Sequence, residues 1–145
     1  MKVLIQRVKK ASVTIDSNLY SSINSGILAF VGIEKGDTKE IAEKLVNKVV
    51  NLRIFQDENK KMNRSLNDVN GEMLIVSQFT LCGDCKKGTR PSFDRLALPM
   101  EAEMLYEYFI SLVKVKGIKV CTGRFGAMMD VELINDGPVT FMLEG

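Results

Sequence analysis

Two hydroxyls and an amide come close together in Ser77-Gln78-Phe79-Thr80, at the end of a mostly apolar run. Main-chain amides and the Gln78 side chain at a strand end can face a reacting carbonyl group and stabilise the negative charge that builds on it. The alternative is structural, with Phe79 in the core and its polar neighbours facing water. Both interpretations remain open from the spacing alone.

The chain contains no histidine. This absence excludes Ser-His-Asp and Cys-His catalysis, histidine-ligated metals and imidazole acid–base chemistry. A hydroxyl nucleophile needs an activating base, so the absence also counts against Ser77 or Thr80 as a covalent nucleophile. Any enzyme built from this chain must use another base or a group of its substrate.

The cysteines are Cys82, Cys85 and Cys121. Cys82-Gly83-Asp84-Cys85 has the spacing of half a zinc site or of a redox pair. A zinc site needs about four ligands, and a redox pair normally opens a helix rather than lying in a glycine-rich loop. We therefore interpret these residues as incidental loop cysteines, and we expect no metal and no cofactor.

The cysteine count is odd and low, and Met1 to Val8 lacks the apolar core of a signal peptide. Together these features predict a reducing, cytoplasmic setting. No apolar run approaches the length that spans a membrane, so we expect no membrane contact.

Lys86, Lys87, Arg90 and Arg95 lie within one short stretch that is offset only by Asp94. Such a stretch is most often a solvated loop. The alternative is a lip that faces phosphate groups, and glycines and a proline in the same stretch favour a shaped loop. The lip would then contact nucleic acid.

Gly137-Pro138 is by default a plain turn. An X-Pro bond can also be cis at modest cost, and a glycine before the proline lets a ligand approach the main chain closely because no Cβ intervenes. The dipeptide is therefore a second candidate for a binding role.

The elements that must position these residues belong to one domain spanning residues 1–145, because a chain of 145 residues with 46% hydrophobic and 26% charged residues can bury one core. A net charge of +2 gives no whole-protein basic field. Alternating or continuous apolar residues predict strands, and helical periodicity predicts two main helices. The strands are expected at 1–8, 11–16, 19–23, 27–33, 73–81, 118–122, 129–133 and 139–143, and the helices at 37–52, capped by Asp37, and from Pro99 to Gly117.

This order predicts a mixed α/β domain in which two main helices pack on a curved, barrel-like sheet. Residues 82–95 are expected to form a loop, and residues 135–138 a turn between the last two strands. Met129 points to the inner face of its strand, where core packing is the default role of a methionine.

Several short segments together resemble the D-aminoacyl-tRNA deacylases of the bacterial and eukaryotic type. The departures are Cys82 and Cys85, where an aromatic and a small polar residue are expected, and the less typical stretch from Leu19 to Gly26. The matching segments are Gln6-Arg7-Val8, Ala11-Ser12-Val13, Leu52-Arg53-Ile54-Phe55, Lys61-Met62-Asn63, Ser65-Leu66, Ser77 to Leu81, Gly88 to Phe93, Thr122-Gly123, Phe125-Gly126-Ala127 and Asn135 to Thr140.

The resemblance implies the deacylase fold and an enzyme that hydrolyses the ester between a D-amino acid and the 3′-terminal adenosine of tRNA. It implies a homodimer with sites near the subunit interface. Ser77, Gln78, Phe79 and Thr80 would line the reaction centre. Gly137 and Pro138, joined by a cis bond, would reach into the partner's site as a gate that rejects L-amino acids.

The same resemblance sets further expectations. Lys86, Lys87 and Arg90 would meet acceptor-stem phosphates, and Met129 would reach the adenine if it is not in the core. The tRNA 2′-OH would help to activate water in a chain without histidine. A gate that rejects side chains would let glycine pass, so glycyl-tRNA, including glycine mischarged on tRNA(Ala), would be hydrolysed.

Two other functions are weighed against this one. A non-catalytic nucleic-acid-binding module could reuse the fold, because a fold does not force an activity. A general esterase would act on esters that lack the terminal adenosine, and the missing histidine counts against it.

Overall fold

The computed structural model describes all residues from Met1 to Gly145. Its first strand, β1 (Lys2–Ile15), buries Val3 and Ile5 near its start and Val13 and Ile15 near its end. Leu4 and Thr14, which alternate with these pairs, are half-buried. Bulges near Val8 shift the pairing without ending the strand. The two separate strands predicted at 1–8 and 11–16 are therefore one strand, because a bulge absorbs Lys9 and pairing with β8 resumes at Lys10.

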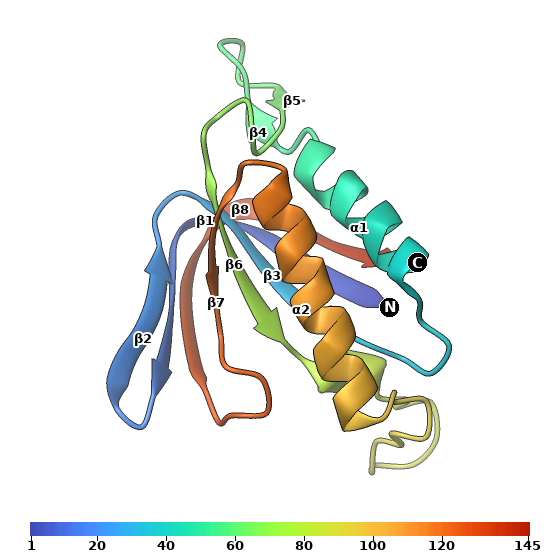
Figure 1. Cartoon of the computed structure of the whole chain (residues 1–145). Coiled ribbons are helices and arrows are strands. Elements are labelled where there is room, and N and C mark those ends of the chain that lie inside the picture. The colour runs from blue at the N-terminus through green and yellow to red at the C-terminus, as the bar shows by residue number, and fades with distance from the viewer.

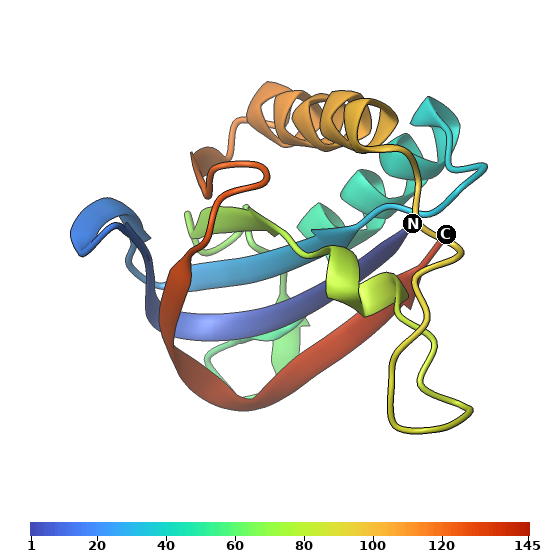
Figure 2. The same cartoon turned by 90° about the horizontal axis from the view of Figure 1, so that it is seen from below.

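The strands form a strongly curved, nearly closed sheet (Figures 1 and 2). β3, β6 and β7 are parallel to one another, and the other pairings are antiparallel. The order is β2-β1-β3-β6-β7, and β8 pairs with β1 alone. The bounds are β2 (Asn18–Ile23), β3 (Gly26–Gly32), β6 (Glu72–Ser77), β7 (Lys119–Thr122) and β8 (Asp130–Glu144).

Two helices, α1 (Lys39–Asn51) and α2 (Pro99–Val115), cover one face of the sheet (Figure 2). The larger hydrophobic core lies between this face and the helices, and a smaller one lies inside the curved strands. This arrangement confirms the predicted mixed α/β class with a barrel-like sheet. None of the helices has the length and apolar character needed to cross a membrane.

The predicted start of α1 is wrong in detail. The cap is Thr38, whose hydroxyl accepts from the Ile41 amide at 3.4 Å. Asp37 instead binds the ammonium group of Met1 and accepts from the Glu34 amide at 2.6 Å. A contact with the distant chain start thus replaces the local cap.

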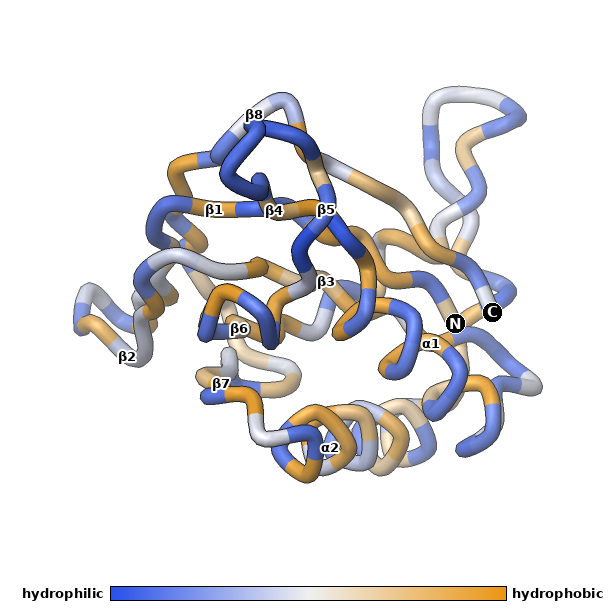
Figure 3. Tube along the Cα trace, turned by 90° about the horizontal axis from the view of Figure 1, so that it is seen from above, coloured by the Kyte–Doolittle hydropathy of each residue, from blue (hydrophilic) through white to orange (hydrophobic).

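Two further boundaries differ from the predictions. The strand expected at 73–81 ends at Ser77, and a 3₁₀ turn, η1 (Phe79–Cys82), follows it. The turn expected at 135–138 lies inside the single long strand β8, as a bulge opposite Arg7. A small hairpin, β4 (Phe55–Gln56) and β5 (Met62–Arg64), projects from the far end of the molecule and is mostly hydrophilic (Figures 1 and 3).

Candidate active site

The candidate turn, which we define as Ser77–Thr80, follows directly from the end of β6. Ser77 pairs with Val31 of β3, and the Gln78 amide donates to the Val31 carbonyl at 2.8 Å. Gly32 permits this close packing, because a Cβ there would lie 2.8 Å from the Cys82 sulfur and 3.0 Å from the Gln78 carbonyl oxygen. A glycine at the end of β3 therefore lets η1 fold against the sheet.

The second half of this turn is open to solvent, while Ser77 and Gln78 are half-buried. Phe79 is 58% exposed and Thr80 is exposed, so the interpretation that placed Phe79 in the core is wrong. The Gln78 side-chain amide donates to the Thr80 hydroxyl. No side chain caps the amides of the first turn of η1, and uncapped amides are suitable donors for an oxygen that gains negative charge.

Phe79 has one aromatic neighbour. Its ring centroid lies 5.3 Å from that of Phe93, with the rings tilted at 58°. Phe93 comes from the loop after η1, so this contact connects the turn to that loop. Cys82 lies beneath the turn, where burial and the Glu34 carboxylate raise the pKa of its thiol, whereas Cys85 is exposed.

The basic loop, residues 84–92, is closed by two hydrogen bonds between the main chains of Asp84 and Ser92, at 2.8 and 2.9 Å. Lys86, Lys87 and Arg90 are exposed on it. The remaining cation of the predicted cluster, Arg95, is also largely exposed but is paired with a carboxylate.

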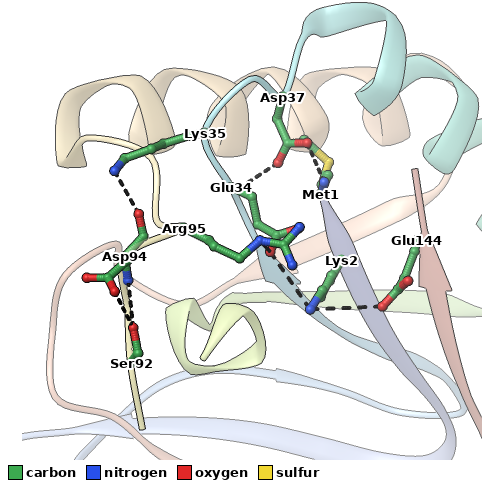
Figure 4. A network of polar contacts seen from close by, with 9 residues as sticks. All are labelled: Met1, Lys2, Glu34, Lys35, Asp37, Ser92, Asp94, Arg95 and Glu144. Atoms are coloured by element: carbon green, nitrogen blue, oxygen red, sulfur yellow. Dashed lines mark hydrogen bonds and ion pairs between the residues drawn. The ribbon is translucent and has the colours of Figure 1, made fainter. Parts of the chain in front are cut away.

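Arg95 takes part in a polar network at the base of the loop (Figure 4). Its Nε lies 3.5 Å from Oε1 of Glu34, and Lys2 lies 3.8 Å from the same oxygen. The Lys35 ammonium donates to the Asp94 carbonyl at 2.7 Å. The network holds the end of the loop, whereas the cations at its tip, Lys86, Lys87 and Arg90, form no ion pair.

The Gly137-Pro138 peptide bond is cis, as the resemblance implies, and lies in the bulge of β8. Arg7 is only 5% exposed, and its Nε lies 2.9 Å from Oδ2 of Asp136 and 3.1 Å from the Asp136 carbonyl oxygen. Its guanidinium also donates to the carbonyl of Ile54. Asn135 donates to the carbonyls of Arg7 at 3.0 Å and Val139 at 3.1 Å.

The turn and the bulge of one chain lie far apart. Val31, which pairs with Ser77, also pairs with Val3 of β1, whereas the bulge lies opposite Arg7 on the other side of β1. They are thus separated by three strand spacings of about 4.8 Å and four residue rises of about 3.4 Å. A small ligand at the turn cannot reach the bulge of its own chain.

Comparison with known families places the chain. Residues 4–144 match the family model described as D-Tyr-tRNA(Tyr) deacylase. The chain belongs to this family.

Individual relatives agree with this assignment. The chain is 57% identical over 143 residues to the D-aminoacyl-tRNA deacylase of Thermodesulfovibrio yellowstonii, covering 99% of this chain and 98% of that protein. It is 53% identical to the deacylase of Aquifex aeolicus, covering 99% and 97%. The solved structure of a protein named c-Myc DNA Unwinding Element Binding Protein has a TM-score of 0.94 and 40% identity, covering 100% of this chain and 99% of that one.

A more distant solved structure, described as a probable eukaryotic D-amino acid tRNA deacylase, shares the fold, with a TM-score of 0.83 at 20% identity. It covers 98% of this chain and 97% of its own. The deacylase fold is thus kept at low sequence identity.

Sequence reasoning missed two residues that organise this deacylase chain. Arg7 appeared only as part of a matching segment, and Asn135 only as part of a turn. Arg7 holds the bulge through its bonds to Asp136, and Asn135 holds it through its bonds to the carbonyls of Arg7 and Val139. A lone arginine in an alternating strand, at a position that should face the core, was the available signal.

Met129 is half-buried and packs against the smaller core cluster. Its sulfur fills the space in front of Gly123, where a Cβ would lie 2.6 Å away. Core packing therefore accounts for this methionine, and contact with an adenine remains a proposal.

Proposed function

We propose that this chain hydrolyses the ester that joins a D-amino acid to the 3′-terminal adenosine of tRNA, at a site built from two subunits. The deacylase activity, an ester hydrolysis in tRNA proofreading, follows from family membership. The observation that supports a two-subunit site is the separation of the Ser77–Thr80 turn from the Gly137-Pro138 bulge within one chain. A second copy can supply the missing half.

The sheet face opposite the helices supports such a dimer. Leu4 alternates with the buried Val3 and Ile5, which pack toward the helices, so Leu4 points the other way. Its partners across the strands are Phe30 and Met142, and Met142 is 48% exposed. This apolar patch lies between the turn and the bulge. A two-fold axis through the patch would place the turn of one subunit opposite the bulge of the other.

The dimer is tested by the solution mass of the wild type and of Met142→Asp. The wild type should be a dimer, and a charge in the patch should shift it toward the monomer. A monomeric wild type that retains full activity would contradict the two-subunit site.

In this proposal the partner's bulge acts as a main-chain gate. D and L forms of an amino acid carry the same side chain, so a side-chain pocket distinguishes them poorly. A rigid main chain close to the α-carbon leaves room for hydrogen alone where an L side chain would point, and rejects it by steric clash. Gly137 and Pro138 are exposed and are held from behind by Arg7 and Asn135.

Gly137→Ala tests the gate. The added Cβ would lie 3.0 Å from the Asn135 side-chain oxygen, so it narrows the gate and shifts its support. We expect deacylation of D-tyrosyl-tRNA to fall at least about 100-fold, because small misplacements at a reacting centre cost that much. A wild-type rate would show that close main-chain approach is not used.

The chain has no imidazole base, so we propose that the ribose 2′-OH of the terminal adenosine helps to activate the attacking water. The amides at Phe79 and Thr80, together with Gln78, would orient the ester carbonyl and stabilise its negative charge. Thr80 positions groups and does not attack. A substrate ending in 2′-deoxyadenosine should not be cleaved, and a fully active deoxy substrate would refute this role.

Glycine has no side chain for the gate to reject. We therefore expect glycyl-tRNA, including glycine mischarged on tRNA(Ala), to be hydrolysed, while L-alanyl-tRNA is spared. The basic loop, with Lys86, Lys87 and Arg90, would contact acceptor-stem phosphates beside the turn of its own subunit. Neutralising these side chains should raise KM and weaken its dependence on salt.

A second candidate is a non-catalytic nucleic-acid-binding module, favoured only by the 40% identical solved structure, whose name ascribes DNA binding to that protein. Deacylation of D-tyrosyl-tRNA distinguishes the two functions. Binding of nucleic acid without release of D-tyrosine would support the second.

A further inference from the structure

A basic groove lies behind the gate, between the end of α1, the β4–β5 hairpin and the end of β8. Its volume is about 380 Å³. Lys48 and Arg53 are the cations that line it, and Met62 and Phe141 contribute exposed apolar surface, 54% and 41% exposed. A cationic groove with an exposed aromatic ring is the usual pattern for binding single-stranded nucleic acid.

The positive charge of this region is not neutralised within the chain. Lys48, Lys60 and Lys61 form no ion pair, and Arg53 makes only a 3.5 Å hydrogen bond to the Asn63 side chain. The charges of these exposed side chains are therefore free to meet phosphates.

The nearby carboxylates are already in use. Asp57 accepts from the amides of Asn59 at 2.8 Å and Lys61 at 3.0 Å, which lowers the pKa of its carboxyl. Asp68 accepts from Ser65, and Glu58 pairs with Arg64. Glu144, which lines the groove, is largely exposed and lies 4.0 Å from Lys2. Among the residues that line the groove, the two cations Lys48 and Arg53 outnumber the one carboxylate, Glu144, so the lining itself favours an anion.

The groove is continuous with the gate. Ile54, which lines the groove, offers its carbonyl to the guanidinium of Arg7, and the same guanidinium binds Asp136 beside Gly137. Phe141 follows Pro138 by three positions in β8. The groove and the gate are therefore parts of one rigid region, so a subunit that inserts its gate into the partner's site also brings its groove to that site.

We propose that the groove of the gate-donating subunit binds the single-stranded 3′ end of the tRNA that is hydrolysed in the partner's site. Lys48 and Arg53 contact backbone phosphates, and Phe141 offers its ring to a base. This inference rests on the proposed gate in trans. The basic loop of the partner would then hold the same tRNA from the other side.

The test is a heterodimer with one working site. One subunit carries Gln78→Ala with Phe79→Ala, which disables its turn but keeps its gate. The other carries Gly137→Val, which disables its gate but keeps its turn. Each homodimer is inactive, and mixing restores activity only if the gate acts in trans. No restoration would refute the gate in trans and, with it, this inference.

The charges are then removed from one side at a time by adding Lys48→Gln with Arg53→Gln. On the gate-donating subunit, we expect KM for D-tyrosyl-tRNA to rise roughly tenfold, kcat to hold, and the salt dependence to lose a slope of about 2. On the other subunit, whose groove serves the disabled site, KM should change less than about twofold. Equal effects on both sides, or none, would overturn the inference while restored activity upholds the gate.

Two controls complete the design. Lys114→Gln with Lys116→Gln removes the same charge at the end of α2 and should leave KM unchanged. The solution mass of each heterodimer shows whether the subunits stay together. If removing Lys48 and Arg53 separates them, the groove is a protein interface and the inference is wrong.

Discussion

The two halves of the proposed site are held in opposite ways. The bulge at Gly137-Pro138 is fixed from behind by Arg7, a nearly fully buried cation, and by both hydrogen bonds of the Asn135 amide. The turn at Ser77–Thr80 is partly exposed and uncapped, and its side chains have only the Gln78–Thr80 hydrogen bond and the Phe79–Phe93 ring contact to hold them. A surface that rejects by clash must be rigid, whereas a surface that stabilises developing charge must leave its donors free.

The largest effect is expected from Arg7→Leu, which removes the support of the bulge. It leaves the Ile54 carbonyl and Asp136 without their donor, at a cost of roughly 2 kcal/mol in unfolding free energy. A displaced gate should lower kcat/KM for D-tyrosyl-tRNA at least about 100-fold. Urea unfolding and deacylation assays measure the two losses.

Arg7→Lys is the matched variant, because it keeps the charge and loses the fork of donors. It should retain part of both stability and activity. If Arg7→Leu lost stability but kept its activity, the bulge would not need to be rigid and the contrast between the two halves would disappear.

A smaller effect is expected from Asn135→Asp. It keeps the size of the side chain and removes the donors to the Arg7 and Val139 carbonyls, so activity should fall about tenfold. Asn51→Asp removes a comparable exposed hydrogen bond, to Asn47 in α1, and should leave deacylation unchanged. Equal effects in the two variants would assign Asn135 a purely structural role.

The support of the Gly137-Pro138 bulge could not be predicted from local sequence. Periodicity identified the strands, the helices and the polar run after β6, because those features are written in neighbouring residues. The bulge is instead held by Arg7, which lies 129 positions away from Asp136 in the chain. Residue spacing alone does not encode such a contact.

Thr80→Val tests the open half. The Thr80 hydroxyl accepts one hydrogen bond from Gln78, and losing it should lower kcat less than about tenfold. Mass spectrometry of the wild type during turnover should show no acyl-enzyme. A trapped acyl group on Thr80, together with a dead variant, would instead identify this residue as a nucleophile.

Phe93→Leu should have a still smaller effect. It removes the ring that lies 5.3 Å from Phe79, and a pair of this kind contributes about 1 kcal/mol. We expect KM to rise about threefold as the turn loses order. The control Phe125→Leu removes a ring 5.7 Å from Tyr106 and should lower Tm without changing KM. A similar rise of KM in both variants would show that the Phe79–Phe93 contact has no specific effect on the turn.

The last prediction concerns the rates at which the two cysteines after the turn, Cys82 and Cys85, react with an alkylating reagent. Because burial raises the pKa of the Cys82 thiol, little reactive thiolate forms there, and Cys85 is exposed. Alkylation at pH 8 followed by peptide mapping should label Cys85 first and Cys82 only after unfolding. Rapid labelling of Cys82 in the native protein would show that the turn opens often.

For the fold too, features set by neighbouring residues could be predicted from the sequence, and features set by distant contacts could not. The mixed α/β class and barrel-like sheet follow from the order of apolar segments, but continuity along β1 and β8 does not, because bulges hide inside polar stretches that resemble turns. The cap of α1 was assigned to Asp37 by local rules. The ammonium of Met1 binds that carboxylate instead, and only the folded chain brings the two together.

β8 leaves one of its sides unpaired along 15 residues. A long strand of this kind invites another chain to add itself by main-chain hydrogen bonding, which is a route to aggregation. Pro138 has no N–H to offer, and the bulge around it breaks the flat run of donors and acceptors. The dipeptide that is proposed to sort mirror-image substrates therefore also hinders the addition of a further strand along this edge.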